Sequence, residues 1–193
     1  FKMIKVDLES YDNSWYKPAR RWKKILWYIT NLIFFKNAIP YPYAFKKWVL
    51  KAFGCKIGRN LVIKPNVSIK YPWLLEIKDN VWIGEHVWID NLAMVSIDSN
   101  VCISQGAMLL SGNHDYTKNS FDLLLDPIYL EEGVWISAKA IVGPGVSCYS
   151  HAILGLGAVA PKNLEAYTIY LGNPAEKIRR RDLYDLPCVW EKV

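Results

Sequence analysis

Between residues 57 and 160 the chain repeats a six-residue pattern. An aliphatic residue, replaced once by Cys and once by Ala, opens each repeat, and the residue four positions later is usually Val or Ala. A six-residue period is neither the 3.6-residue period of a helix nor the two-residue alternation of a single strand. It predicts an all-β solenoid in which each repeat forms one short strand and its opening side chain points into the core. The opening positions are 57, 63, 69, 77, 83, 89, 97, 103, 109, 130, 136, 142, 148, 154 and 160.

Three intervals in this repeat are longer than six residues. Those from 69 to 77 and from 89 to 97 span eight residues, and that from 109 to 130 spans twenty-one. With three repeats in each coil, all three insertions fall on the same side of successive coils. The sequence therefore predicts about five triangular coils, stacked at about 4.8 Å, with a long loop over 111–129 that leaves the third coil.

The two ends of the chain do not follow the repeat. The ranges 18–36 and 42–53 predict two helices, because each has a Pro near its first turn, where Pro is well tolerated. Residues 176–186 predict a short C-terminal helix. We therefore expect a basic, aromatic-rich helical segment over 1–55, a β-helix over 56–175, and a C-terminal helix and tail over 176–193.

Positive charge is concentrated near the N-terminus. Residues 1–55 carry eleven Lys or Arg and three Asp or Glu, whereas the whole chain of 193 residues has a formal net charge of +6. Two interpretations stay open for this segment: its helices cap the open end of the solenoid, or they dock on an anionic membrane. The sequence has no evident signal peptide and no C-x-x-C pair, so we expect a cytoplasmic protein, with the inner face of the membrane as a peripheral alternative.

Several motifs within residues 55–181 resemble those of the hexapeptide-repeat acyltransferases, a family of left-handed parallel β-helices. They are Asn113-His-Asp-Tyr116, Gly133-Val-Trp-Ile136, Val142-Gly-Pro-Gly145 and Leu171-Gly-Asn-Pro-Ala175. Further stretches resemble the branch that acetylates sugars in exopolysaccharide biosynthesis of the colanic-acid type: Tyr71-Pro-Trp-Leu74, Val87-Trp-Ile-Asp-Asn91 and Val101-Cys-Ile-Ser-Gln-Gly106.

This resemblance implies a fold and an activity. It implies a left-handed parallel β-helix, a hand that six-residue spacing alone does not give, since the usual crossover rule favours the right hand. The implied activity is acetyl-CoA-dependent O-acetyl transfer to a sugar or glycan precursor, performed by a homotrimer.

His114 is the candidate catalytic base. It stands near the start of the long loop, and loops of this length are often functional. Histidine titrates near neutral pH, so its imidazole can take a proton from a hydroxyl that attacks a thioester. The resemblance implies this role for the loop histidine, and Asp115 is the candidate to orient it. Asp90 and Asn91, one coil below the loop on the same side, are candidates for binding an acceptor hydroxyl.

The candidates for binding acetyl-CoA come from the same motif matches. Coenzyme A requires a narrow slot for its pantetheine arm and positive charge for its phosphates. The resemblance implies that Trp135 and Ala138 lie near the thioester and Leu156 further along the arm. It implies that Lys162 and Arg179 lie near the nucleotide. Ala138 has no hydroxyl, so only its backbone N–H can donate to a developing oxyanion.

Other functions find less support in the sequence. The remaining histidines, His86 and His151, stand three coils apart, which opposes the zinc site of a β-helix carbonic anhydrase and predicts that no metal is required. No nucleic-acid-binding module is recognisable. Two alternatives stay open: an N-acetyl- or longer-chain acyltransferase on the same scaffold, and a non-catalytic β-helix that binds glycan or membrane. The acceptor sugar and the hydroxyl that is modified also stay open. So do the length of the acyl chain and whether the sugar is linked to a lipid or to a nucleotide.

Overall fold

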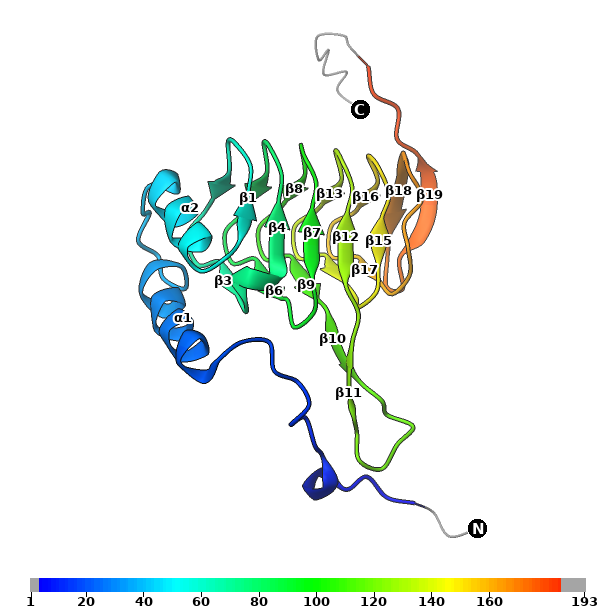
Figure 1. The fold of residues 1–193 in the computed structure, drawn as a ribbon. Helices are drawn as coiled ribbons and strands as arrows, with labels where there is room; N and C mark the ends of the chain where they lie inside the picture. The colour runs from blue at the N-terminus through cyan, green and yellow to red at the C-terminus, as the bar shows by residue number, and fades with distance from the viewer. Residues whose placement is uncertain (1–3, 185–193) are drawn as a thin grey trace.

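The repeats fold into a parallel β-solenoid with three flat faces (Figure 1). The computed structural model describes residues 4–184. Each coil contributes one strand to each face in turn, and each of these strands pairs in parallel with the strand one coil away. The predicted triangular solenoid is therefore confirmed. The strands complete five coils and β18 begins a sixth.

We name the three sheets faces A, B and C. Face A contains β1 (Lys56–Ile57), β4 (Leu75–Ile77), β7 (Val95–Ile97), β12 (Ile128–Leu130) and β15 (Ser147–Cys148). Face B contains β2 (Val62–Ile63), β5 (Trp82–Ile83), β8 (Cys102–Ile103), β13 (Trp135–Ile136), β16 (Ile153–Leu154), β18 (Thr168–Leu171) and, at its edge, β19 (Glu176–Arg180). Face C contains β3 (Ser68–Ile69), β6 (Trp88–Asp90), β9 (Met108–Leu110), β14 (Ile141–Val142) and β17 (Val159–Ala160).

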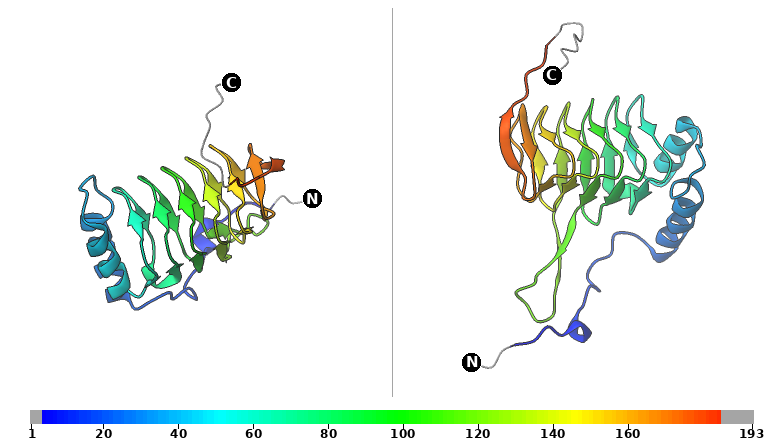
Figure 2. Two further views of the ribbon diagram at one scale, coloured as in Figure 1. Left: turned by 90° about the horizontal axis from the view of Figure 1, so that it is seen from above. Right: turned by 180° about the vertical axis from the view of Figure 1, so that it is seen from behind.

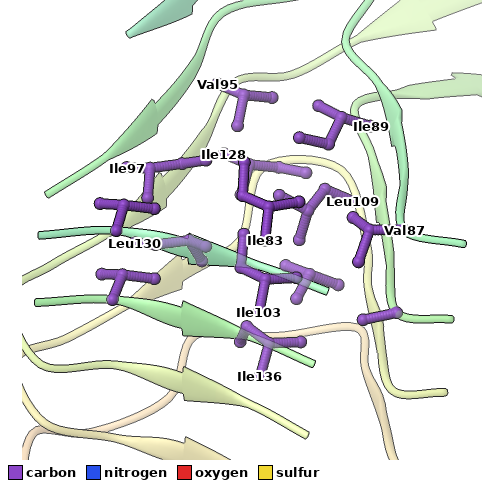
Figure 3. Packing of buried hydrophobic residues seen from close by; sticks show 14 of the residues in the cluster. Ile83, Val87, Ile89, Val95, Ile97, Ile103, Leu109, Ile128, Leu130 and Ile136 are labelled. Atoms are coloured by element: carbon purple, nitrogen blue, oxygen red, sulfur yellow. The ribbon is translucent and has the colours of Figure 1, made fainter. Parts of the chain in front are cut away.

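The side chains that open the repeats fill the inside of the prism (Figure 3). All of them are at most 9% exposed. They stack in register from coil to coil, because Ile83 pairs with Ile103 and Ile103 with Ile136. Each buried aliphatic side chain contributes roughly 1.5–3 kcal/mol relative to an exposed one. The six-residue period therefore identifies the core correctly.

Asparagines at the corner between faces A and B form a ladder along the prism. Asn60 donates a side-chain hydrogen bond to Asn80 at 2.8 Å, and Asn80 donates one to Asn100 at 3.2 Å. All three have positive φ, between 53° and 61°, which Asn tolerates better than most residues. The expectation that such residues occupy the corners is met.

All three insertions lie at the corner where face C passes to face A, as the spacing predicts. The first contains a short 3-10 helix, η2 (Pro72–Leu74). The third is a hairpin of β10 (Gly112–His114) and β11 (Leu123–Leu125), which pair antiparallel with His114 opposite Leu123. This hairpin projects away from the prism (Figure 1).

Two helices cap the open end of the first coil. They are α1 (Arg21–Phe34) and α2 (Tyr43–Ala52), both within the predicted ranges. Trp27 Nε1 and Asn31 Nδ2 donate to the carbonyl oxygen of Ile69 at 2.9 and 3.2 Å. No preceding coil is present to pair with this strand end, so the helix satisfies it instead. Among the described residues, no helix is long and apolar enough to span a bilayer.

The N-terminal segment before α1 runs along the molecule to the hairpin (Figure 2). It contains one 3-10 turn, η1 (Leu8–Ser10). The backbone N–H of Asp7 donates to the carbonyl oxygen of Asn119, near the hairpin tip, at 2.8 Å. Residues far apart in the sequence are thus brought to the loop that carries His114.

The prediction of a C-terminal helix from residue 176 is wrong. Glu176–Arg180 form β19, which pairs antiparallel with β18. Strand β18 is the last parallel strand of face B, so its outer edge would otherwise present unpaired N–H and C=O groups. Pairing along this edge outweighs the local preference for helix. Residues 185–193, the end of the predicted tail, lie outside the described residues.

Candidate active site

The imidazole of His114 is held on two sides by Phe121. His114 Nδ1 lies 2.8 Å from the Phe121 carbonyl oxygen, and the two rings stack with centroids 4.4 Å apart and planes 9° from parallel. A carbonyl oxygen can only accept a hydrogen bond, so the proton of the neutral ring resides on Nδ1. Nε2 then keeps its lone pair. The geometry therefore suits a general base acting through Nε2.

Asp115 makes no hydrogen bond to the imidazole of His114, contrary to the expectation from the sequence. Its Oδ1 accepts hydrogen bonds from the backbone N–H and hydroxyl of Thr117, at 3.0 and 2.5 Å. These two bonds hold the pKa of the Asp115 carboxyl below its usual value. Asp115 therefore stabilises the turn of the hairpin, and the Phe121 carbonyl orients His114.

The ring of Tyr11 lies beside the imidazole of His114, a contact that the sequence did not predict. Its ring centroid lies 5.6 Å from that of His114, with the two planes tilted by 56°. Tyr11 belongs to the N-terminal segment, which has no repeat to set its register against the solenoid. Phe121 was missed for a similar reason, because the long loop lies outside the six-residue period.

Tyr16 binds the same segment to the second insertion, one coil below the hairpin. Its hydroxyl donates to the carbonyl oxygen of Leu92 at 2.5 Å. Burial, together with the nearby Tyr71 and Asp90, raises the pKa of this hydroxyl, so it stays a donor at neutral pH. Two tyrosines of the N-terminal segment thus lie on the side of the molecule where acceptor binding is expected.

Asp90 and Asn91 lie below the hairpin, but their side chains differ in availability. Asn91 is fully buried; its Nδ2 donates to the carbonyl oxygens of Tyr71 and Leu74, and its Oδ1 accepts from the Tyr71 N–H. Its amide therefore holds two insertions together. The Asp90 side chain is 19% exposed, and its Oδ1 lies 3.4 Å from Lys70 Nζ without a hydrogen bond. Of these two residues, we therefore keep only Asp90 as a candidate for binding the acceptor.

Three of the acetyl-CoA candidates lie together on face B and its corner with face C. Trp135 points outward from β13, 42% exposed, and its Nε1 donates to Ser104 Oγ at 2.9 Å. Ala138 and Leu156 occupy this corner on successive coils, and the N–H of Gly157 donates to the Ala138 carbonyl oxygen at 3.0 Å. Within residues 4–184 the Ala138 N–H donates no hydrogen bond, so it is available to an oxyanion.

The two basic candidates lie apart from each other, Arg179 at the edge of face B and Lys162 at another corner. Lys162 follows β17 at the corner between faces C and A, and Arg179 lies on β19 opposite Ile169 of β18. Both side chains are exposed. The structure therefore does not gather the five acetyl-CoA candidates on one surface of the chain.

His114 and the thioester candidates occupy different corners of the same chain. The hairpin rises from the corner between faces C and A, whereas Ala138 lies at the corner between faces B and C. On the fourth coil, Ala138 and Gly143 mark the two ends of face C, and five extended residues span about 16 Å. One chain alone does not bring the base and the thioester candidates together.

The other two histidines lie at corners, as expected. His86 and His151 both have positive φ, of 59° and 60°, and the His151 ring stacks on Tyr167 with centroids 4.7 Å apart. Across the part of the chain that the structure describes, no group of three or more His, Cys, Asp or Glu side chains is placed to hold a metal ion.

Comparison with known proteins identifies the family. No family model matches the chain. It is, however, 34% identical over 156 residues to an Escherichia coli (strain K12) protein provisionally named colanic acid biosynthesis acetyltransferase WcaF. The match covers 81% of this chain and 86% of that protein. The chain belongs to the hexapeptide-repeat acetyltransferase family.

Solved structures of acetyltransferases share the fold. Galactoside acetyltransferase in complex with coenzyme A superposes with a TM-score of 0.74 at 20% identity, covering 86% of each chain. An acetyltransferase of Vibrio cholerae O1 biovar eltor, complexed with acetyl-CoA, gives a TM-score of 0.68 at 19% identity, covering 75% of this chain and 81% of that one. The predicted left-handed parallel β-helix is confirmed, and the protein is an acyltransferase.

Proposed function

We propose that this acetyltransferase transfers the acetyl group of acetyl-CoA to a hydroxyl of a sugar or glycan precursor. The arrangement of His114 carries the proposal: the Phe121 carbonyl holds Nδ1–H, which leaves Nε2 as a proton acceptor on a projecting hairpin. The name of the Escherichia coli relative supports a role in polysaccharide synthesis.

The chain supplies the groups that this reaction needs. His114 Nε2 takes the proton of the acceptor hydroxyl as its oxygen attacks the thioester carbonyl carbon. The Ala138 N–H stabilises the oxyanion of the tetrahedral intermediate. The intermediate then breaks the C–S bond, and the imidazolium returns the proton to the leaving thiolate. Asp90 accepts a hydrogen bond from the acceptor and positions it.

The active unit in this proposal is a homotrimer, in which a second copy completes the site. Face B carries exposed tryptophans, Trp82 and Trp135, whereas face A carries ion pairs such as Lys56–Glu76. Packing of face C, from its third coil onward, against face B of the next copy brings the hairpin to the neighbour's Trp135, and three such contacts close a ring. A fully active monomer in light scattering at micromolar concentration would contradict this arrangement.

The acetyl-CoA site in this proposal lies between two copies. Trp135 and Leu156 line the slot for pantetheine, and Arg179 and Lys162 meet the phosphates. Both basic side chains are exposed and are therefore accessible to a charged ligand. No metal enters the reaction as proposed.

We propose that the protein works in the cytoplasm, at the inner face of the membrane. Nucleic acid is not among its proposed partners. The outer side of α1 supports the peripheral contact, because Trp22, Leu26, Ile29 and Ile33 recur at helical spacing and are all exposed. This apolar side belongs to the basic segment of the chain, and apolar and basic groups together favour anionic lipid.

Incubation with acetyl-CoA and a panel of nucleotide- and lipid-linked sugars tests the proposed reaction. Mass spectrometry should show one acceptor gaining the mass of an acetyl group. Mild alkali should remove that group, because an ester hydrolyses under conditions in which an amide survives. A stable product would favour the N-acetyltransferase alternative, and glycan binding without acetyl-CoA consumption would favour the non-catalytic one.

A further inference from the structure

A cavity of about 740 Å³ lies between α1 and the outer surface of face C. Ser68 on β3 and Trp88 on β6 line it from the solenoid, and Ile25 and Tyr28 line it from α1. It lies at the first two coils, whereas the hairpin leaves the third. None of the groups discussed above for the acetyl-transfer step lines it.

The helix side of this cavity continues into an exposed apolar surface. Ile25 and Tyr28 line the cavity but are also 52% and 62% exposed. Ile29 and Leu32 follow at the spacing of one helix face and are exposed as well. An apolar chain leaving the cavity would therefore remain in contact with α1.

The cavity is also positively charged. Lys24, Lys36 and Lys70 line it, and no carboxylate does. Lys70 forms an ion pair with Asp90, but neither Lys24 nor Lys36 pairs with a carboxylate within residues 4–184. Unpaired amines beside an apolar surface match a ligand that joins an anionic head to an apolar chain.

The side-chain amide of Asn31 is only partly hydrogen-bonded within residues 4–184. It lines the cavity, is 7% exposed, and uses its Nδ2 on the Ile69 carbonyl oxygen. Its Oδ1 has no hydrogen-bond partner among the described residues. A buried acceptor in this state is costly, and a hydroxyl-bearing ligand would satisfy it.

We propose that the cavity binds the phosphate and the first part of the aliphatic chain of a lipid-linked sugar. This inference rests on the proposed sugar acetylation and makes the acceptor lipid-linked rather than nucleotide-linked. The lysines meet the phosphate, Asn31 accepts from a hydroxyl beside it, and the chain follows α1 toward the bilayer. A nucleotide carrier has no apolar chain to cover that helix.

The position of the cavity relative to the hairpin fits this acceptor. Lys70 joins the cavity to Asp90 through their ion pair, and Asp90 pairs across face C with Leu110, two residues before the hairpin. A sugar attached to a phosphate in the cavity is thus directed along this corner toward His114.

Binding of decyl phosphate, below its micelle concentration, to the full chain tests the proposal by calorimetry. We expect decyl phosphate to bind about tenfold or more tightly than inorganic phosphate, decanol or uridine diphosphate, because only decyl phosphate has both features. Equal affinity for uridine diphosphate would overturn the proposal. So would complete displacement of decyl phosphate by phosphatidylglycerol vesicles at equal lipid concentration, since a bulk phospholipid would then be the occupant.

Two variants locate the binding site. Lys24→Gln with Lys36→Gln should weaken binding of decyl phosphate about tenfold while leaving decanol unchanged. Ser68→Phe should weaken both, because it fills the cavity without changing charge. Lys17→Gln with Lys51→Gln removes the same charge from the same basic segment outside the cavity, and should bind as wild type does. Wild-type affinity in the first double variant, or equal loss in this control, would overturn the assignment.

This binding test is independent of acetyl transfer. Failure of decyl phosphate to bind, with His114-dependent acetylation of a sugar intact, would overturn the lipid site and leave the proposed function standing. Binding as expected, without acetylation of any acceptor, would overturn the proposed function instead.

Discussion

The carbonyl oxygen of Phe121 accepts a hydrogen bond from Nδ1 of His114 at 2.8 Å. Histidine bases in enzymes commonly use a carboxylate in this position, which also stabilises the imidazolium. A neutral carbonyl fixes the tautomer but adds no full negative charge. The orientation of the proposed base therefore depends on the fold of the hairpin more than on a charged partner.

Replacing His114 by Ala should slow acetyl transfer by roughly 10²–10⁴-fold, the usual contribution of a general base. The KM for acetyl-CoA should change little, because other residues are proposed to hold that substrate. Steady-state kinetics with the true acceptor measures both values. His86→Asn is the matched control, since His86 is a corner residue with positive φ that Asn also adopts. Wild-type turnover in His114→Ala would show that the base is elsewhere.

Replacing Asp115 by Ala should leave turnover within about threefold of wild type. Its carboxylate bonds to Thr117 and not to the imidazole, so its loss loosens the turn without removing the partner of Nδ1. A loss comparable to that in His114→Ala, measured in the same assay, would restore Asp115 as the group that orients the base.

Replacing Tyr11 by Ala should raise the KM for the acceptor by about tenfold, which is the loss of one modest aromatic contact. The KM for acetyl-CoA should stay unchanged, because Tyr11 lies beside His114, where the acceptor is proposed to bind. Tyr11→Phe keeps the ring and should behave as wild type. If both variants alter only the KM for acetyl-CoA, Tyr11 does not face the acceptor.

Replacing Arg179 by Ala should raise the KM for acetyl-CoA by about tenfold with a smaller effect on kcat, as expected for a phosphate contact. Arg180→Ala is the control, because successive residues of a strand point to opposite sides and Arg180 pairs with Asp182 at 3.6 Å. Equal effects of the two substitutions would indicate general charge attraction rather than a specific contact.

Lys46 gives the protein a pH-dependent stability. Its ammonium is fully buried and donates to the Lys64 carbonyl oxygen at 3.0 Å, and burial lowers its pKa. Between that lowered value and the ordinary value of about 10.4, the unfolded chain binds more protons, so the free energy of unfolding rises with pH.

Urea unfolding of wild type and Lys46→Met compares these stabilities directly. Raising the pH from about 7 to about 10 should increase the stability of wild type relative to Lys46→Met, because the variant has no amine to titrate. Other groups titrate equally in both proteins and cancel. If the difference in free energy of unfolding between the two proteins stays constant with pH, burial does not lower the pKa of Lys46.

The sequence predicts the solenoid well, because its period is a direct physical requirement. A residue such as Ile103 must point inward at every sixth position, and a corner residue such as Asn100 must tolerate positive φ. The same arithmetic predicts the corner from which the hairpin leaves. These features depend only on neighbouring coils.

Features that depend on distant contacts were not predictable in this way. The pairing of Arg179 with Ile169 follows from an unpaired sheet edge and not from the local sequence. The proximity of Tyr11 to His114 joins two segments that both lie outside the repeat. For the site, the sequence therefore indicated His114 as the candidate base but did not indicate the groups that hold its ring.

The caps at the two ends of the prism stop further strands from adding to it. A stack of identical repeats carries no internal signal to stop, and its bare ends would recruit further strands from other molecules into fibres. The bonds from Trp27 and Asn31 to Ile69 close one end, and β19 closes face B at the other. Whole coils can therefore be gained or lost between these caps during evolution while the protein remains a discrete particle.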